Sequence, residues 1–174
     1  WEWAVLGGTG VAGCWRKSDR PGGAGDIAPA VYRRVVSRLE ASVANDRDAR
    51  AYVCMDKALT FGEIDALSRA LAAWLQGRGL KRGARIGIMM PNVLQYPVAI
   101  MGVLRAGLTV VNVNPLYTPR ELRHQMVDSG ALAIVVLDNF AHTVADVLAD
   151  TQIRQVITTG VGDMLAFPKG AIIN

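Results

Sequence analysis

The segment Arg85-Ile86-Gly87-Ile88-Met89-Met90-Pro91-Asn92 carries the pattern from which the fold of this chain follows. Its apolar run is short and ends at a proline and an asparagine, which is typical of a strand buried on both faces. Similar runs follow at 108–113, 132–137 and 155–159, and segments of helical period separate them. Buried strands that alternate with helices pair in parallel, and the helices cover both faces of the sheet. The sequence therefore predicts an α/β fold with a mostly parallel sheet and helices on both faces.

Helices are expected before and between these strands. Their predicted ranges are 29–45, 60–79, 94–105, 118–130 and 139–149. Two of them begin with a capping box, in which a threonine and the glutamate three residues later satisfy backbone N–H groups at the helix start. These pairs are Thr60 with Glu63 and Thr118 with Glu121. A short hairpin over 51–60 precedes the first capping box, and Gly79 is expected to end the helix that follows it.

The helix over 60–79 is expected to pack on the sheet through one apolar stripe. Its predicted buried residues are Phe61, Ile64, Leu67, Leu71, Trp74 and Leu75. Its predicted solvent-facing residues are Glu63, Asp65, Ser68, Arg69 and Gln76.

The composition is that of a chain that forms a core: of 174 residues, 51% are hydrophobic and 20% are charged. These values exclude the disordered, collagen-like and disulfide-scaffold classes. The 19 basic and 15 acidic residues give a net charge of +4, and the densest basic group is Lys81, Arg82 and Arg85. That group is too small for a nucleic-acid-binding stripe, so no nucleic-acid partner is expected. No apolar run reaches the ~18 residues that a membrane-spanning helix needs.

The first 26 residues differ from the rest of the chain, because seven of the 18 glycines lie within the first 25 positions. Residues 1–26 are therefore expected to be a disordered or artefactual leader, and residues 27–174 to form the folded domain. The leader contains Gly8-Thr9-Gly10-Val11-Ala12-Gly13, which matches the G-x-G-x-x-G fingerprint of dinucleotide-binding loops. The fingerprint requires a helix directly after it, and only residues 14–20 are free before Pro21. A stand-alone α/β nucleotide-binding module that uses Gly8, Gly10 and Gly13 is the alternative function.

No catalytic or metal site is predicted from spacing alone. The sequence has no G-x-S-x-G elbow, no H-E-x-x-H pair and no Walker loop. Cys14 and Cys54 cannot form a zinc site by themselves, and two free thiols fit a reducing compartment. His124 and His142 have no partnered nucleophile and are expected at the surface.

The turns after the strands are the candidate ligand-binding positions, because ligands of parallel sheets bind beyond the carboxyl ends of the strands. These turns contain Pro91, Asn92, Asn114, Pro115, Asp138 and Asn139. All six are also ordinary turn residues. Both roles stay open, and Pro91, Asn92, Asn114 and Pro115 are taken as candidates that support a substrate pocket.

Two segments resemble motifs of a known superfamily. Leu59-Thr60-Phe61-Gly62-Glu63-Ile64 resembles the first core motif of the adenylate-forming enzymes, which include acyl-CoA synthetases, peptide-synthetase adenylation domains and luciferases. Gly102-Val103-Leu104-Arg105-Ala106-Gly107, which leads into 110–117, resembles the second. Segments 89–99, 112–122, 128–131 and 139–143 resemble specifically the bacterial long-chain fatty-acid CoA ligases. The resemblance covers nearly the whole chain, from about residue 15 or 27 to residue 174.

The resemblance implies that the chain is part of the large N-terminal domain of an acyl-CoA synthetase. Enzymes of this family use Mg²⁺ and ATP to convert a fatty carboxylate into an acyl-adenylate and diphosphate, and then transfer the acyl group to coenzyme A. For the full-length enzyme it therefore implies ATP, Mg²⁺ and CoA as cofactors and a long-chain fatty acid as substrate. The expected location is cytoplasmic, with peripheral association at the inner membrane.

The chain departs from the family pattern in its catalytic motifs. The phosphate-binding loop, the later ribose-binding acid and the lysine of the mobile C-terminal domain lie downstream in these enzymes and are absent here. Phe167-Pro168-Lys169-Gly170 lacks the preceding Ser/Thr/Gly-rich run, so the phosphate role is not carried over to it. The hypothesis is an N-terminal fragment that is inactive alone and binds none of the cofactors tightly. An apolar sheet edge left open would make it an oligomer or aggregate.

Overall fold

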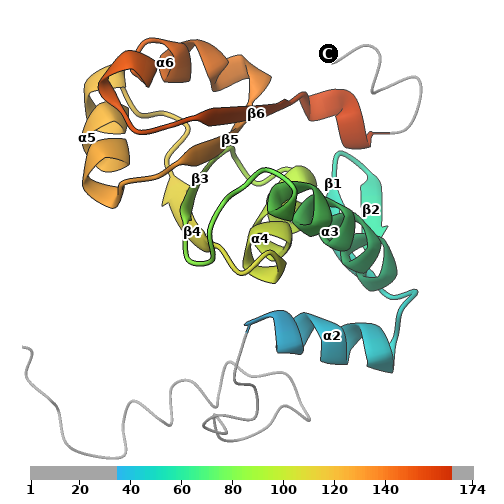
Figure 1. Ribbon diagram of the computed structural model, residues 1–174. Coiled ribbons are helices and arrows are strands. Elements are labelled where there is room, and N and C mark those ends of the chain that lie inside the picture. The colour runs from blue at the N-terminus through green and yellow to red at the C-terminus, as the bar shows by residue number, and fades with distance from the viewer. Residues whose placement is uncertain (1–34, 166–174) are drawn as a thin grey trace, which may run out of the picture. The chain divides into compact units, whose positions relative to one another are not determined.

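The computed structural model describes residues 35–165, which contain two β-sheets and the helices around them (Figure 1). A two-stranded antiparallel sheet is formed by β1 (Arg50–Cys54) and β2 (Lys57–Thr60). A parallel four-stranded sheet has the order β4-β3-β5-β6. Its strands are β3 (Arg85–Met89), β4 (Thr109–Val113), β5 (Ala133–Leu137) and β6 (Gln155–Thr159). The α/β class and the parallel sheet predicted from the sequence are confirmed.

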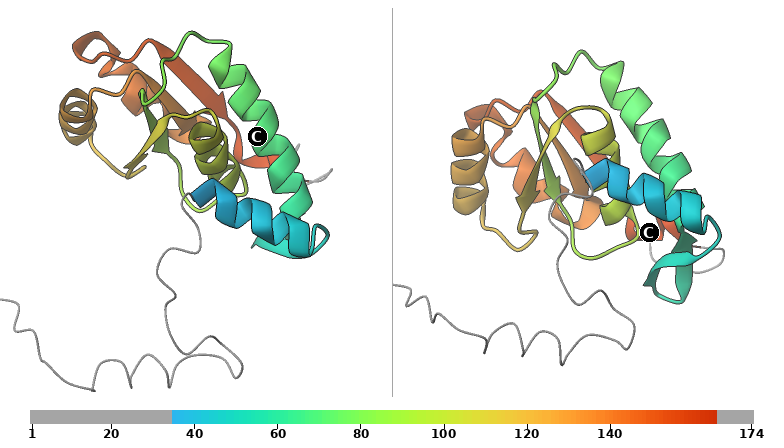
Figure 2. Two further views of the ribbon diagram at one scale, coloured as in Figure 1. Left: turned by 60° about the horizontal axis from the view of Figure 1, so that its bottom comes forward. Right: turned by 90° about the horizontal axis from the view of Figure 1, so that it is seen from below.

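The helices lie on both faces of the four-stranded sheet, with α3 and α4 on one face and α5 and α6 on the other (Figures 1 and 2). The α-helices are α2 (Val35–Asn45), α3 (Phe61–Gln76), α4 (Gln95–Arg105), α5 (Pro119–Ser129) and α6 (Ala141–Ala145). The connection from β3 to β4 runs through α4, and the connection from β4 to β5 runs through α5 and passes β3. The direction of winding therefore reverses between β3 and β5, which is the topological switch point of the sheet.

The strand residues alternate between two hydrophobic cores. Ile86 and Ile88 of β3 pack with α3 and α4, whereas Met89 of the same strand packs with α5 and α6. All five residues of β5 are buried. The prediction that strands are buried on both faces holds for β3 and β5, but β4 and β6 contain exposed and half-buried residues. These two strands flank the central pair, so within residues 35–165 each has only one neighbouring strand.

Most helix and strand ends predicted from the sequence agree with the structure to within one or two residues. Both capping boxes are present, and Gly130 ends α5 with a left-handed backbone (φ 60°), as expected of a glycine C-cap. The end of α3 differs, because Gly77 is its C-cap and Gly79 (φ 73°) lies in the turn beyond it. The predicted start at Pro29 lies outside the described residues.

The predicted helix over 139–149 is only partly correct, because the α-helix is limited to Ala141–Ala145. The segment forms the 3₁₀ turn η1 (Asp138–Phe140), the short helix α6 and a second 3₁₀ turn η2 (Leu148–Asp150). The backbone N–H groups of Val147, Asp150 and Thr151 each donate to the carbonyl three residues earlier. Such bonds wind the backbone more tightly than an α-helix, and both Val144 and Val147 are buried in the core.

The predicted orientation of α3 is only partly correct. Asp65 and Ser68 were expected to face solvent and are buried, with 7% and 0% of their surface exposed. Leu67 and Trp74 were expected in the core and are 38% and 41% exposed. The physical reason is that α4 packs against this helix and supplies a charged partner for Asp65, so the buried face of α3 contains polar side chains. None of the helices within residues 35–165 has the length and apolarity to cross a membrane.

Candidate functional site

The turns that follow the four parallel strands meet at one edge of the sheet. The strand register places Met89 beside both Val113 and Val136, and Leu137 beside Thr159. The turn with Pro91 and Asn92 therefore lies between the turn with Asn114 and Pro115 and the turn with Asp138 and Asn139. The structure brings the predicted positions together at the carboxyl edge, as the topology requires.

The polar groups of two of these turns are used by the turns themselves. The Oδ1 atom of Asn114 accepts a hydrogen bond from the backbone N–H of Leu116 (3.0 Å), and its carbonyl accepts one from Tyr117 (3.2 Å). The carbonyl of Pro91 accepts a hydrogen bond from the N–H of Val93 (2.8 Å). These contacts are those of turn-forming residues. Asn114 and Pro91 thus shape the edge through hydrogen bonds within their own turns.

Asn92 lines a small cavity between the hairpin and the start of α4. The cavity has a volume of about 180 Å³. It is lined by Tyr52, Val53, Cys54, Asn92, Val93, Leu94, Tyr96 and Pro97. A second cavity of about 150 Å³ shares Tyr52 and Pro97 with it. The lining is mostly apolar and contains no carboxylate, histidine or basic side chain, so this site can hold an apolar group.

Gln95 is a residue of the carboxyl edge that sequence reasoning did not single out. It is the first residue of α4 and is 5% exposed, and its Nε2 atom donates a hydrogen bond to the carbonyl of Gly160 (2.7 Å). This bond joins the start of α4 to the end of β6. The sequence feature that could have identified Gln95 is its polar side chain in the first turn of an otherwise apolar helix.

Asn112 near the end of β4 is held by two side chains. Tyr96 donates from its hydroxyl to the Oδ1 atom of Asn112 (3.1 Å), and Gln125 donates from Nε2 to the backbone carbonyl of Asn112 (3.0 Å). Because Tyr96 belongs to α4 and Gln125 to α5, these bonds join both helix layers to one edge strand.

A buried charged cluster connects three helices away from this edge. Arg105 of α4 contacts Asp65 of α3 (Nη2 to Oδ1, 2.6 Å) and Glu40 of α2 (Nη1 to Oε1, 3.4 Å). Arg69 contacts the same Asp65 carboxylate from one turn along α3 (3.0 Å). The side chains of Arg105 and Asp65 are only 7% and 10% exposed. Neither partner was predicted as a site residue, although Arg105 belongs to the second motif.

The electrostatics of the cluster favour the ionised carboxylate. Burial by itself raises the pKa of Asp65, but the hydrogen bond from Arg69 and the charges of Arg105, Arg69 and Arg47 outweigh it and hold this pKa below its ordinary value. The hydrogen bond to Asp65 raises the pKa of Arg69. Both groups therefore remain charged near neutral pH, and the cluster acts as a fixed ionic contact.

The glycines of the two motifs allow close approach of backbone and side chains. A Cβ atom on Gly102 would lie 2.6 Å from Cδ2 and 3.0 Å from Cβ of Leu71, so this glycine lets α4 pack tightly on α3. A Cβ atom on Gly62 would lie 2.6 Å from Cγ of Arg47, and the N–H of Gly62 donates to the carbonyl of Arg47 (2.8 Å). Both motifs thus contribute to the packing of α3, the second against α4 and the first against the segment that follows α2.

The histidines lie away from the cavity beside Asn92, and the described cysteine is one of the residues that line it. His124 and His142 are exposed, as expected, and Cys54 is a half-buried free thiol. Within the part of the chain that the structure describes, no group of three or more His, Cys, Asp or Glu residues could hold a metal ion. Cys14, the Gly8–Gly13 segment and Lys169 lie outside the described residues.

The parallel sheet with its switch point and two helix layers defines the class of doubly wound α/β domains. Within this class, a family model for AMP-binding enzymes matches residues 39–173. The chain belongs to the AMP-binding enzyme family. The alternative module built on Gly8, Gly10 and Gly13 is not favoured, because those residues lie outside the matched range.

Comparison with individual proteins agrees with this family. The chain is 53% identical over 150 residues to a long-chain-fatty-acid–CoA ligase of Escherichia coli O6:H1, which covers 86% of this chain and 27% of that protein. It is also 49% identical over 144 residues to a long-chain-fatty-acid–CoA ligase of Haemophilus influenzae. The matched region covers 82% of this chain and 26% of that protein. A solved long-chain-fatty-acid-CoA ligase from Archaeoglobus fulgidus shares the fold with a TM-score of 0.68 at 24% identity, over 74% of this chain and 29% of that one. The chain thus spans about a quarter of the length of these relatives.

Proposed function

We propose that this chain forms the first part of the AMP-binding domain of a long-chain fatty-acid CoA ligase and acts there as a scaffold. The observation that carries the proposal is 53% identity, over 86% of the chain, to a relative with that name. The packing of the two motifs supports the scaffold role, since Gly62, Gly102 and Arg105 contact other parts of the chain. The residues that would surround the reacting groups belong to the remainder of such an enzyme.

The reaction proposed for the whole enzyme has two steps. The fatty carboxylate attacks the α-phosphorus of ATP, which forms an acyl-adenylate and releases diphosphate. The thiol of CoA then loses its proton and attacks the acyl carbon, so that a thioester forms and AMP leaves. Both steps need positioned cationic and hydrogen-bonding groups to offset developing charge.

The residues present do not fit the charged part of this chemistry. A magnesium ion is held by carboxylate and phosphate oxygens, and residues 35–165 offer no acidic cluster that could supply such ligands. The exposed side chains of the carboxyl edge include the amides of Asn92, Asn114 and Asn139 and the carboxylate of Asp138, and the cavity beside Asn92 is mostly apolar. We therefore derive no metal-dependent step for this chain and propose that it binds ATP, Mg²⁺ and CoA only weakly.

The proposal also covers the candidate pocket residues. We propose that Pro91, Asn92, Asn114 and Pro115 support a substrate pocket indirectly, by fixing the path of the chain at the carboxyl edge. Leu116 follows directly and is 79% exposed, so this edge presents apolar surface next to the turn. Substituting the turn residues should change substrate affinity in the whole enzyme more than it changes the rate of the chemical step.

Two experiments test the proposed function. In the first, residues 39–173 replace the corresponding region of the Escherichia coli ligase, and the chimera is assayed for acyl-CoA formation from a long-chain fatty acid. We expect an active chimera, and a chimera that melts cooperatively but has no activity would overturn the proposal. In the second, the 174-residue chain alone is assayed for exchange of labelled diphosphate into ATP, and we expect none. Fatty-acid-dependent exchange would show that this chain itself holds the catalytic groups.

The domain limits, location and assembly state remain predictions. We propose that the folded domain begins near residue 27 and that residues 1–26 are a separate leader. We propose a cytoplasmic location, which fits the free thiol of Cys54. Self-association is proposed through β6, which has one neighbouring strand within the described residues and exposes Val156 (39%). Sedimentation equilibrium tests this, and a monomer at high concentration would contradict it.

A further inference from the structure

Two neighbouring side chains at the start of α4, Gln95 and Tyr96, connect this helix to both outer strands of the four-stranded sheet. Gln95 donates from Nε2 to the carbonyl of Gly160, directly after β6 (2.7 Å). Tyr96 donates from its hydroxyl to the Oδ1 atom of Asn112 in β4 (3.1 Å). Because the sheet has the order β4-β3-β5-β6, the two bonds reach both of its margins at the carboxyl edge. The two bonds together are called the edge brace below.

The start of α4 depends on the edge brace because it has no side-chain cap. Both α3 and α5 begin with capping boxes, whereas the N-cap of α4 is Leu94, whose side chain makes no capping hydrogen bond. The first N–H groups of a helix have no partner inside the helix, and a helix start without a cap is less stable. The edge brace fixes this helix start through partners that are 65 and 16 residues away in sequence.

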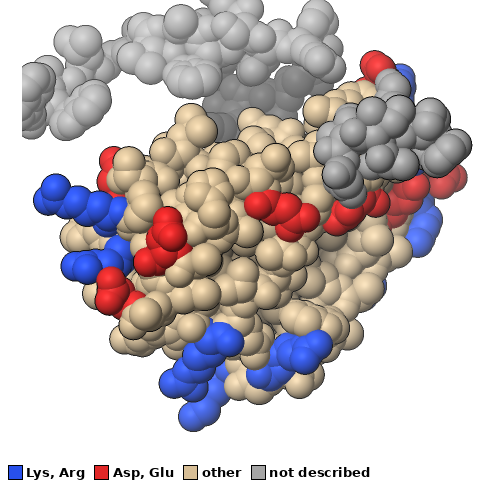
Figure 3. All heavy atoms as spheres, turned by 90° about the horizontal axis from the view of Figure 1, so that it is seen from above, with Lys and Arg blue, Asp and Glu red and all other residues tan. Residues whose placement is uncertain are grey.

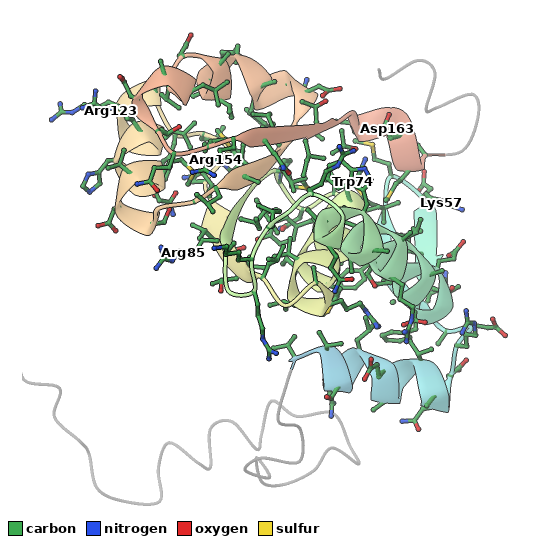
Figure 4. All side chains as sticks on the ribbon, in the orientation of Figure 1. Lys57, Trp74, Arg85, Arg123, Arg154 and Asp163 are labelled. Carbon is green, nitrogen blue, oxygen red and sulfur yellow. The ribbon has the colours of Figure 1, made fainter. Side chains whose placement is uncertain are left out.

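The acceptor of the Gln95 bond is itself held in place. Gly160 is buried, and its backbone N–H donates to the Oδ2 atom of Asp163 (2.8 Å). The same oxygen accepts a hydrogen bond from the hydroxyl of Thr159 (2.9 Å). Asp163 lies in the 3₁₀ turn η3 (Val161–Met164), which follows β6 directly (Figure 4). Gln95 therefore bonds to a carbonyl that the turn after β6 keeps at a fixed position.

The first turn of α4 and the turn before it also form one wall of the cavity beside Asn92. The residues of this wall are Asn92, Val93, Leu94, Tyr96 and Pro97. Gln95 does not line the cavity, because its side chain is directed to Gly160. Since the wall residues are consecutive apart from Gln95, a shift of the helix start would move them together. The edge brace therefore sets the position of this wall.

The edge brace and the wall are built from uncharged groups. The brace joins two amide side chains, one phenol and one backbone carbonyl. The face of the molecule in Figure 3 is likewise mostly uncharged, with its basic side chains at the margins. Such a wall offers no charge to a carboxylate or a phosphate, whereas apolar linings are typical of sites that bind the hydrocarbon part of a ligand.

We propose that Gln95 and Tyr96 are positioning residues that set the affinity of the whole enzyme for the hydrocarbon chain of its fatty-acid substrate. The proposal rests on the proposed function, since it takes the cavity beside Asn92 as part of the substrate pocket. Gln95 acts only through the wall of the cavity, whereas Tyr96 also belongs to that wall. Loss of either hydrogen bond therefore raises KM for the fatty acid and leaves kcat for acyl-CoA formation nearly unchanged.

Steady-state kinetics of the ligase chimera that contains residues 39–173 measure this effect. Gln95→Met keeps the length of the side chain and removes the donor, and Tyr96→Phe keeps the ring and removes the hydroxyl. Because one hydrogen bond is worth roughly a factor of five to ten, we expect KM for palmitate to rise by about that factor in each variant. KM for ATP and kcat should stay within about twofold of the unsubstituted chimera. An unchanged KM for palmitate in both variants, or a fall in kcat of about tenfold in variants that melt cooperatively, would overturn the proposal.

Gln155→Met is the matched control for Gln95→Met. Gln155 also donates from Nε2 to a backbone carbonyl, that of Arg78 (3.2 Å). It is the first residue of β6 and therefore lies at the opposite end of that strand from Gly160. We expect this control to leave KM for palmitate unchanged. A rise in KM equal to that of Gln95→Met would show that the effect is not specific to the carboxyl edge and would contradict the proposal.

Amide hydrogen exchange of the 174-residue chain tests the edge brace without any ligation. In an α-helix that begins at Gln95, the N–H groups of Val98 and Ala99 make the first bonds to carbonyls four residues earlier. We expect their exchange to be about fivefold faster in Gln95→Met and unchanged in Gln155→Met. Unchanged exchange in Gln95→Met would overturn the proposal, whereas an inactive unsubstituted chimera would count against the proposed function.

Discussion

The two faces of the parallel sheet are built from different interactions. On the face covered by α3 and α4, close packing depends on Gly102 and on a buried ionic contact between Asp65 and Arg105. On the face covered by α5 and α6, the core consists of aliphatic and methionine side chains such as Leu122, Met126 and Ile134. The first face contains both sequence motifs of the family. Both motifs therefore lie on the face whose packing depends on particular atoms, and we expect this face to tolerate the least change.

The reason lies in the kind of contact. Aliphatic cores accept substitutions that conserve volume, because the contacts have no preferred direction. A buried ion pair and a glycine at a helix crossing depend on particular atoms at particular distances, and a change of one partner leaves a charge or a clash behind. The two faces should therefore respond differently to substitutions of similar size.

The largest effect is expected for Arg105→Met. This substitution leaves the buried carboxylate of Asp65 without its closest partner, and loss of one member of a buried ion pair costs about 3–5 kcal/mol. Urea unfolding followed by circular dichroism measures the change in the free energy of unfolding. The double variant Asp65→Leu/Arg105→Met removes both charges and should recover most of the stability. A single variant as stable as the wild type would show that the ion pair is not important on this face.

A smaller effect is expected for Gly102→Val. The new side chain would overlap with Leu71, and overpacking of this kind costs about 1–3 kcal/mol. Adding Leu71→Ala should restore part of the loss, because it removes the atoms that clash. Met126→Leu on the opposite face conserves volume and should cost less than about 1.5 kcal/mol. If Met126→Leu destabilises more than Gly102→Val, the contrast between the faces is wrong.

A third substitution, Thr118→Ala, tests the ends of the helices rather than their packing. It removes the hydroxyl that accepts from the N–H of Glu121 at the start of α5, and loss of such an N-cap costs about 1 kcal/mol. Thermal melting measures the effect, with Thr118→Ser as the control that keeps the hydroxyl. Equal losses for both substitutions would assign the effect to the methyl group instead.

The smallest effect is expected from acid. Because the folded-state pKa of Asp65 lies below its ordinary value, its ionic contacts stabilise the fold fully above the ordinary pKa of 3.8. This contribution is lost as the pH falls below that value toward the folded-state pKa. The difference in stability between the wild type and Asp65→Asn should therefore be constant near neutral pH and shrink in acid. A difference that grows in acid would contradict the direction of the pKa shift.

Helices and strands were predicted well where a single strong pattern of residues close in sequence determined them. The capping boxes at Thr60 and Thr118 and the continuous apolar run of β5 are examples, since each depends on residues close in sequence. The segment after β5 was predicted as one helix because its composition is helical, but backbone bonds that span three residues break it. The spacing of apolar residues in the sequence could not show that the backbone winds more tightly here than in an α-helix.

The polar part of the core could not be predicted from local patterns. Asp65 was assigned to the solvent face because a carboxylate is usually exposed, and its partner Arg105 lies 40 residues away. Gln95 was missed for the same reason, because the carbonyl of Gly160 to which it donates is 65 residues distant. The turn residues Asn92 and Asn114 were found because the carboxyl edge of a parallel sheet can be located from the strand ends alone. Their contribution to a substrate pocket remains a prediction.

We propose that the motif-bearing face, which is covered by α3 and α4, supports the enzyme without taking part in its chemistry. The most direct test is the turnover of the ligase chimera that contains residues 39–173 and the double substitution Asp65→Leu/Arg105→Met. If the claim is correct, kcat for acyl-CoA formation stays within about threefold of the unsubstituted chimera, even if the melting temperature changes. A fall of about a hundredfold in a chimera that remains folded would contradict the claim and place these charges in the catalytic machinery.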